Sequence, residues 1–374
     1  MKNWILMAVG LALSSPAYAQ FGGINKGLEK ARQIQEQKQK FDDLNVTDEE
    51  ELKIGADVSL KVRQRFGVVQ DPAVHKYVTL VGTLLAQQTD RPKLGWTFIV
   101  LDTDGVNAFA SPGGFVHITR GALGLIKSEG ELAGVLAHEI THIAHKHTVS
   151  AIRKNKAVQL GTSETLSDRG PFLDKIANKA YEMVLENTFD RGDELDADKE
   201  AINLTQKTGY APGALADFLA RLDDRNKDQP QKNGLFASHP ETKERIEKVR
   251  QLAGSKTGAL VAARYTSNVK YQPTEITKIA VVVEGSAGLA GSTDDKKEAN
   301  NKDAKKEEEP KKKGFGLGSL KQTVAPEKQS AQVSASGGAR GVGPDRLAKG
   351  GSNPNPVKVT APADEIASFK RGIA

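Results

Sequence analysis

The sequence predicts an α+β fold in which helices dominate and the sheet is small. Most of the chain between residues 46 and 253 carries apolar residues at helical spacing, preceded by residues that cap helices. Only two short runs, WTFIVLD at 96–102 and GFVHITR at 114–120, have the composition of strands. The chain has no cysteine, which excludes disulfides, thiol nucleophiles and cysteine-ligated zinc sites.

Residues 1–19 have the features of a secretory signal peptide. Lys2 gives a positive start, residues 4–13 are apolar, and Ala17 and Ala19 have the spacing of a cleavage site. We therefore expect cleavage after Ala19. The alternative is an N-terminal anchor helix, but the apolar run is short for a membrane span. An exported chain without cysteine indicates a bacterial periplasm.

The remaining chain divides by composition into four parts. Residues 20–45 form a polar lead-in with helical potential, and residues 46–253 carry the folded domain. Residues 254–290 are an extension with one possible strand, and residues 291–374 form a low-complexity tail. The tail ends in a short amphipathic segment, ADEIASFKRGI, that could dock elsewhere. We expect the rest of the tail to be disordered.

The net charge of +6 does not indicate a nucleic-acid partner. Much of the basic excess lies in the tail, where no aromatic residues are interleaved to stack on bases. We interpret the tail as a solubilising segment, with peripheral association to the cell envelope as the alternative.

The helices of the domain are expected in a fixed order. The first follows Thr47 and Glu50, which form a capping box, and the second follows Asp71 as cap with Pro72 at its first position. A turn-rich link at 105–113 joins the two strands. The next helix is capped by Ser128. Further helical stretches are expected at residues 171–208, 209–222 and 238–253.

Four of the seven histidines fall within residues 137–147, AHEITHIAHKH. On a helix, His138 and His142 share one face with Cβ atoms about 6 Å apart, so both imidazoles can reach one metal ion. Glu139 lies beside them. This H-E-x-x-H pattern supplies two zinc ligands and a carboxylate that accepts a proton from zinc-activated water. A solvated helix face is the alternative, but the apolar flanks indicate burial, and buried imidazoles need partners.

A catalytic zinc ion usually has three protein ligands, so a third is required. Thr148 stands six residues after His142, which excludes the elongated motif with a third histidine there. On a straight helix, His145 would lie about 10 Å along the axis from His138. His147 would point to the opposite side.

The segment DELDADKEA at 193–201 offers a better third ligand. Glu194 and Asp198 are four residues apart, so on a helix both can face one point. Glu194 could bind zinc, and Asp198 could hold a zinc-bound histidine by its free N–H group. An exposed acidic helix face explains these two residues equally well.

Five segments together resemble one known family. They are VNAFASPGGFVHITRGAL, ELAGVLAHEITHIAHKH, RGDELDADKEA, TGYAPGAL and SHPETKERI, and they occur in that family's order within residues 46–253. The chain resembles zinc metallopeptidases of the HtpX, BepA and CAAX-prenyl-endopeptidase type, which form the gluzincin peptidase family M48. The signal peptide and the lack of later membrane spans make it similar to the soluble, periplasmic BepA-like branch.

The resemblance implies a site and a fold. His138, His142 and Glu194 would bind one zinc ion per chain, Glu139 would be the general base, and Asp198 would hold a ligand. The fold would be a zincin-like core whose small sheet has an edge strand beside the active site. The resemblance gives His147 a structural role and leaves His145 unassigned.

We expect the substrate to bind as an added strand, since a free sheet edge pairs with any extended backbone. Two segments could provide that edge. One is Ala108, Phe109 and Ala110, and the other is the strand from Gly114 to Thr119.

The resemblance also places His239 and Arg245 close to the zinc. His239 could donate to the reaction's oxyanion, with Arg245 assisting or orienting it. Alternatively, His239 could occupy the open zinc position in the resting enzyme. A histidine before Pro240 could also be a local helix cap.

The sequence thus predicts a periplasmic zinc endopeptidase that hydrolyses unfolded or misassembled envelope proteins. The first alternative is a chaperone-like protein that binds extended polypeptides with little proteolysis. The second is a surface-binding module in which the tail is the working part.

Overall fold

The computed structural model describes residues 46–154, 169–186, 189–227, 242–275, 280–281, 334–335 and 353–373. The chain divides into two units, residues 1–47 and 48–374, and every described helix and strand belongs to the second. The expected signal peptide, the lead-in helix, His239 and most of the tail lie outside the described residues. None of the described helices is long and apolar enough to cross a bilayer.

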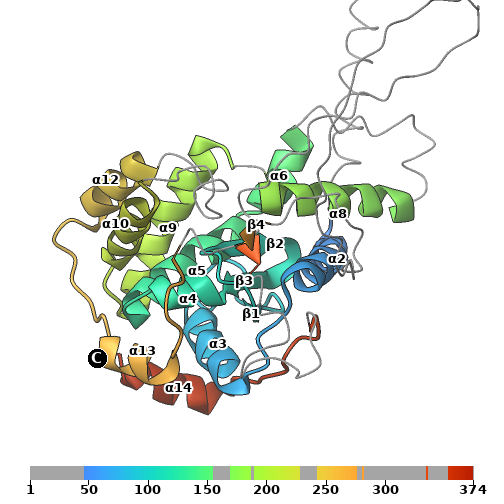
Figure 1. The fold of residues 1–374 in the computed structure, drawn as a ribbon. Coiled ribbons are helices and arrows are strands. Elements are labelled where there is room, and N and C mark those ends of the chain that lie inside the picture. The colour runs from blue at the N-terminus through green and yellow to red at the C-terminus, as the bar shows by residue number, and fades with distance from the viewer. Residues whose placement is uncertain are drawn as a thin grey trace, which may run out of the picture. The chain divides into compact units, whose positions relative to one another are not determined.

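Helix α5 (Glu129–Ala144) lies at the centre of the second unit (Figure 1). It begins at Ser128, whose side chain accepts a hydrogen bond from the backbone N–H of Glu131, as predicted. All of its residues except Ala144 are buried. A helix that is buried on every side needs neighbours all round. These include α3 (Pro72–Ala86), α9 (Arg191–Thr208) and α10 (Ala214–Asn226).

Three strands form a mixed sheet that packs against α5. The order is β1 (Thr97–Leu101), β3 (Phe115–Thr119) and β2 (Ala108–Ser111). β1 is parallel to β3, and β2 is antiparallel to it. The turn η1 (Pro112–Gly114) joins β2 to β3, with Gly113 at φ 73°. A Cβ there would lie 2.7 Å from the Cα atom of Leu52, so the turn requires glycine.

The mostly helical α+β fold with a small sheet is confirmed. The interpretation of residues 105–113 as only a turn-rich link is wrong, because it contains β2. The second predicted edge, from Gly114 to Thr119, is also wrong. β3 is the central strand and is paired on both sides, and Gly114 belongs to the turn. β2 is an outer strand of the sheet, but its four residues are buried and α8 (Arg169–Glu186) packs against it.

The other helices surround this centre. α2 (Asp48–Phe66) packs on η1 and α8, and α6 (His147–Lys154) packs on α8. α12 (Thr242–Ala253) packs on α9 and α10. The predicted cap of α3 is confirmed, since Asp71 accepts a hydrogen bond from the backbone N–H of Ala73.

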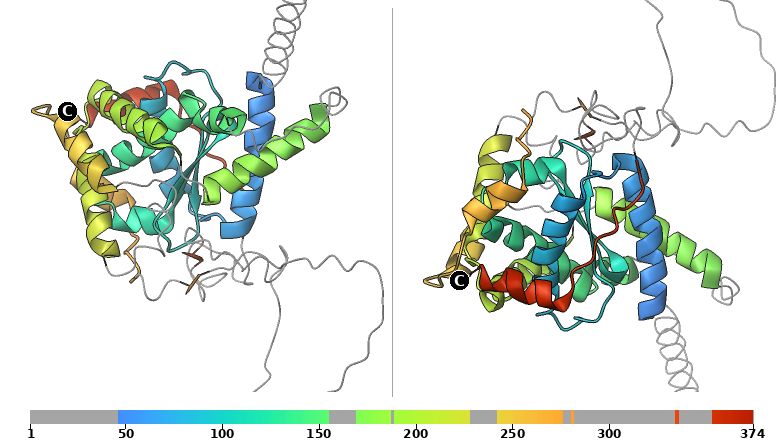
Figure 2. Two further views of the ribbon diagram at one scale, coloured as in Figure 1. Left: turned by 90° about the horizontal axis from the view of Figure 1, so that it is seen from above. Right: turned by 90° about the horizontal axis from the view of Figure 1, so that it is seen from below.

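The core continues past the predicted boundary at residue 253. α13 (Ala262–Asn268) buries Tyr265, and α14 (Ala363–Arg371) buries Ile366. Figure 2 shows α14, in red, alongside α3 despite the long separation in sequence. The ring of Phe369 lies 6.0 Å from that of Tyr77, centroid to centroid. The predicted C-terminal amphipathic segment is therefore a docked helix. The short strands β4 (Ala280–Val281) and β5 (Ser334–Ala335) pair with each other.

Candidate metal centre

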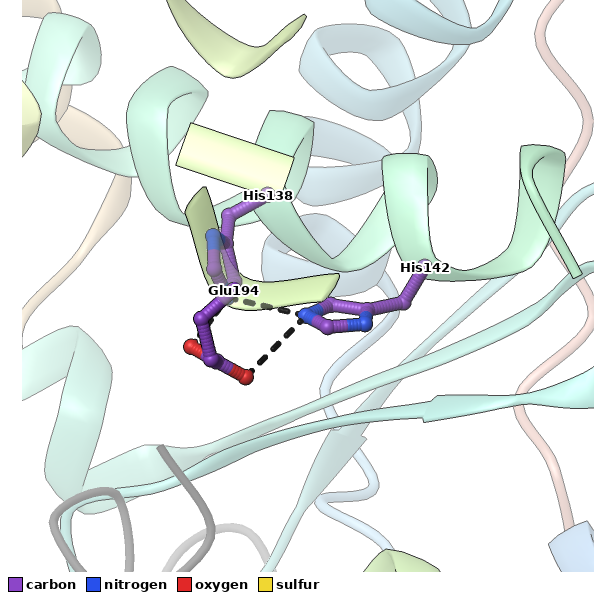
Figure 3. Close-up of side chains that lie close together, drawn as sticks. All are labelled: His138, His142 and Glu194. Atoms are coloured by element: carbon purple, nitrogen blue, oxygen red, sulfur yellow. Dashed lines mark hydrogen bonds and ion pairs between the residues drawn. The ribbon is translucent and has the colours of Figure 1, made fainter. Parts of the chain in front are cut away.

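His138, His142 and Glu194 meet between α5 and α9. Figure 3 shows the two histidines on successive turns of one helix, both directed toward the glutamate of the other. Their Nε2 atoms are 3.1 Å apart. The two carboxylate oxygens of Glu194 lie 3.5 Å from His138 Nε2 and 3.5 Å from His142 Nε2. All three side chains are buried.

These distances fit a tetrahedral zinc site. With bonds of about 2.0–2.1 Å, ligand atoms on a tetrahedron are separated by about 3.3 Å. Two imidazole nitrogens and one carboxylate oxygen also suit the chemistry of zinc. The three residues together can therefore hold a metal ion and leave a fourth position open.

Local sequence explains why Glu194 reaches this point. Asp190 caps α9 by accepting from the backbone N–H of Asp193, which places Glu194 in the first turn. Ala197 and Ala201 are fully buried small residues on the same helix. They allow the backbones of α9 and α5 to approach closely.

Asp198 and Arg245 support the trio from behind. Asp198 Oδ1 lies 3.0 Å from His138 Nδ1, as expected of a residue that orients a ligand. Arg245 donates to both oxygens of Asp198 over 2.8 and 2.7 Å, and its Nη1 lies 2.9 Å from Glu194. The resemblance placed Arg245 close to the zinc, and in the structure it lies beside Asp198 and Glu194. Its closest partners are these two carboxylates, and its Nη2 atom also lies 3.4 Å from His138 Nδ1. The predicted assistance to His239 concerns a residue outside the described part of the chain.

The electrostatics of this group favour charged forms. Burial opposes ionisation of Asp198, but Arg245 and His138 lower the pKa of its carboxyl to about 2. Burial and Arg245 also oppose the charging of His138, but hydrogen bonds to Asp198 and Glu194 raise its pKa to about 9. Because His138 Nδ1–H points to Asp198, Nε2 is the nitrogen that exchanges its proton for a metal ion.

Glu139 lines a small pocket together with His138. The pocket is lined by His138, Glu139, Arg245 and four apolar residues, Val135, Leu215, Phe218 and Leu219. Glu139 is thus a buried carboxylate, adjacent in sequence to His138, on the wall of a mostly apolar pocket.

The helix does not continue through His147, contrary to the sequence-based expectation. α5 ends at Ala144, and Lys146 adopts a left-handed conformation at φ 56°. The chain therefore turns back, and His147 Nδ1 comes within 3.0 Å of His142 Nδ1. Phe189 stacks on the ring of His142 with centroids 3.9 Å apart. Sequence reasoning missed both neighbours of His142, because nothing local marks a helix break at a lysine.

The family comparison agrees with this geometry. Residues 72–253 match the sequence model described as Peptidase family M48. These residues form an M48 peptidase domain. Helix α5, which carries the H-E-x-x-H pattern, and helix α9, which carries Glu194, both lie inside the matched region.

Relatives of the domain occur in bacteria and eukaryotes. The chain is 26% identical over 216 residues to the beta-barrel assembly-enhancing protease of Yersinia pestis, covering 55% of this chain and 44% of the relative. It is 26% identical over 220 residues to the mitochondrial metalloendopeptidase OMA1 of Schizosaccharomyces pombe, covering 57% and 64%. The metalloprotease LoiP of Escherichia coli K12 is 24% identical over 152 residues, covering 39% and 58%. The chain thus matches less than half the length of the beta-barrel assembly-enhancing protease.

Proposed function

We propose that this protein is a zinc-dependent endopeptidase of the bacterial envelope that cuts unfolded or misassembled proteins. The observation that carries the proposal is the buried trio of His138, His142 and Glu194, with Glu139 beside it at the pocket. The names of its relatives, protease and metalloendopeptidase, support peptide hydrolysis. The sequence features of residues 1–19 and the bacterial relatives support export to the periplasm, with cleavage after Ala19.

Each residue has one task in the reaction. His138, His142 and Glu194 would hold the zinc ion. When bound, zinc supplies Lewis acidity that acidifies a water molecule and polarises the scissile carbonyl. Glu139 takes the proton of the attacking water on a carboxylate oxygen. It then passes that proton to the nitrogen of the leaving amine as the C–N bond breaks.

Asp198 and Arg245 keep this machinery oriented. Asp198 fixes the ring of His138 by accepting its Nδ1–H, and Arg245 fixes Asp198 with two hydrogen bonds. Arg245 also forms an ion pair with Glu194, so its guanidinium links α12 to α9, the helix that carries Glu194 and Asp198. Arg245 borders the pocket as well, which is consistent with help to a developing oxyanion. For His239, the proposed role as a donor to the oxyanion rests on the sequence.

We further propose that the substrate pairs with β2, along Ala108, Phe109 and Ala110. β2 packs directly against α5 and is an outer strand of its sheet. Its residues are buried in this structure, so binding requires the elements that cover it, including α8, to move aside. Main-chain pairing gives affinity without sequence preference, which suits unfolded substrates.

Casein hydrolysis by the purified mature protein tests the proposed function. We expect activity that 1,10-phenanthroline abolishes and that stoichiometric zinc restores. The protein without chelator and a sample with an inactive phenanthroline isomer are the controls. Binding of unfolded casein without any cleavage would instead favour the chaperone-like alternative.

A further inference from the structure

A second group of metal-binding side chains lies at the C-terminal end of α5. His145 Nδ1 is 2.5 Å from Asp196 Oδ2, and His147 Nε2 is 3.3 Å from the same oxygen. The three residues each offer one ligand atom, and these atoms lie within 4.8 Å of one another. None of the three belongs to the first trio, and the proposed reaction does not use them.

The backbone brings these side chains together in a specific way. Residues two apart on a helix point in different directions, so His145 and His147 could not share a ligand in a continuous helix. The left-handed turn at Lys146 changes that direction. His145 is also the C-cap of α5, where the exposed carbonyl end of the helix favours a cation. Asp193 adds a further carboxylate, 4.0 Å from His147 Nε2.

An ion can reach this group from solvent. The side chains of His145 and Asp196 are 33% and 45% exposed, whereas that of His147 is only 8% exposed. His147 therefore forms the inner wall, and the other two residues form the entrance. This exposure also predicts weaker binding than in the buried trio, because the ligands are solvated and less fixed.

The second group contacts the first through one hydrogen bond. If His142 binds zinc through Nε2, its Nδ1 carries the proton and donates to His147 Nδ1, 3.0 Å away. His147 then carries its own proton on Nε2, the nitrogen that lies 3.3 Å from Asp196 Oδ2. A metal ion on His147 Nε2 would replace that proton. The neutral ring would then carry a proton on Nδ1, facing the proton of His142.

We propose that His145, His147 and Asp196 form a second, weaker site for a divalent transition metal such as Zn²⁺, and that filling it inhibits the first site. Inhibition follows because the second ion removes the acceptor that orients a ligand of the first. The inhibitory coupling rests on the proposed function. The existence of the second site does not.

Equilibrium dialysis of the zinc-loaded mature protein against rising zinc concentrations tests the site itself. We expect metal analysis to give two ions per chain for the parent and one for His145→Gln and for Asp196→Asn. Asp57→Asn is the control: it removes one negative charge, as Asp196→Asn does, but from an exposed position on α2, and it should keep two ions. A single ion in the parent up to millimolar zinc, or a second ion retained by both site variants, would overturn the proposal. In the former case the group is a hydrogen-bonded network only.

Casein hydrolysis over the same zinc range tests the coupling. Loss of a partner that orients a metal ligand typically costs 10- to 100-fold in activity, so we expect at least a roughly tenfold fall in the parent. His145→Gln should keep its basal rate and resist this inhibition. Equal inhibition of the parent and the variant would overturn the coupling. Two bound ions without any proteolysis would refute the proposed function and leave the second site standing.

Discussion

Replacing Asp198 with asparagine should weaken both zinc binding and folding. The substitution keeps the size of the side chain but removes its charge. Asp198 is fully buried, and its carboxylate accepts from Arg245 and contacts His138 Nδ1 at 3.0 Å. The variant therefore leaves the buried guanidinium without one of its two carboxylate partners among the described residues, and Glu194 stays in contact at 2.9 Å.

The magnitude follows from that burial. Removing one partner of a buried ion pair costs about 3–5 kcal/mol, and because Glu194 remains near Arg245 we expect about 3 kcal/mol. For a domain of this size each kcal/mol lowers Tm by about 2–4 °C, so Tm should fall by about 10 °C. Loss of the carboxylate behind His138 should also weaken zinc binding about 10- to 100-fold.

Two assays measure these effects on the metal-free and zinc-loaded proteins. Thermal unfolding gives Tm, and competition with a chromogenic chelator gives the zinc affinity. Asp224→Asn is the matched control, because that side chain is 73% exposed and its ion pair with Lys227 should contribute little. A Tm within 2 °C of the parent, together with zinc affinity within about twofold, would refute the reasoning about the buried charges.

Three further predictions concern substrate binding, the C-terminal segment and pH. Ala110→Pro should lower peptide hydrolysis at least about tenfold with zinc content unchanged, because β2 loses a main-chain donor; an unchanged rate would remove β2 as the substrate strand. Deleting residues 353–374 should lower the free energy of unfolding, measured in urea, by about 4 kcal/mol, because the burial of the Ile366 and Ile373 side chains against the core is lost. An unchanged midpoint would mean that the segment does not dock. The pKa of Asp198 is lowered to about 2 from 3.8, so its stabilisation is present above pH 3.8 and is lost as pH falls through 2. Metal-free parent protein should therefore lose stability more steeply than Asp198→Asn between those values, and parallel acid unfolding curves would contradict this.

The parts of the structure that depend on local spacing could be predicted from the sequence. The cap of α3 by Asp71 follows from side chains next to one another in the chain. The pairing of His138 with His142, four residues apart on one helix, follows in the same way. The convergence of Glu194 on them needed more than spacing, because an exposed acidic helix has the same pattern. The family resemblance supplied that step.

The parts that depend on distant contacts could not be predicted. β2 is four residues long and becomes a strand because β3 pairs with it, which no local pattern reveals. The break at Lys146 is stabilised from outside the helix, by ion pairs to Asp48 and Glu51. α14 docks on α3 through contacts such as that of Lys76 with Glu365, far apart in the chain.

Zinc content and casein hydrolysis of Glu139→Gln, measured on the same preparation beside the parent, test the central claim most directly. The amide keeps the size of the side chain but cannot accept the proton of the attacking water. The rate per bound zinc should therefore fall at least about 100-fold while zinc content stays the same. A variant that loses its zinc would make Glu139 a ligand, and one that keeps the parent's rate would show that the base lies elsewhere.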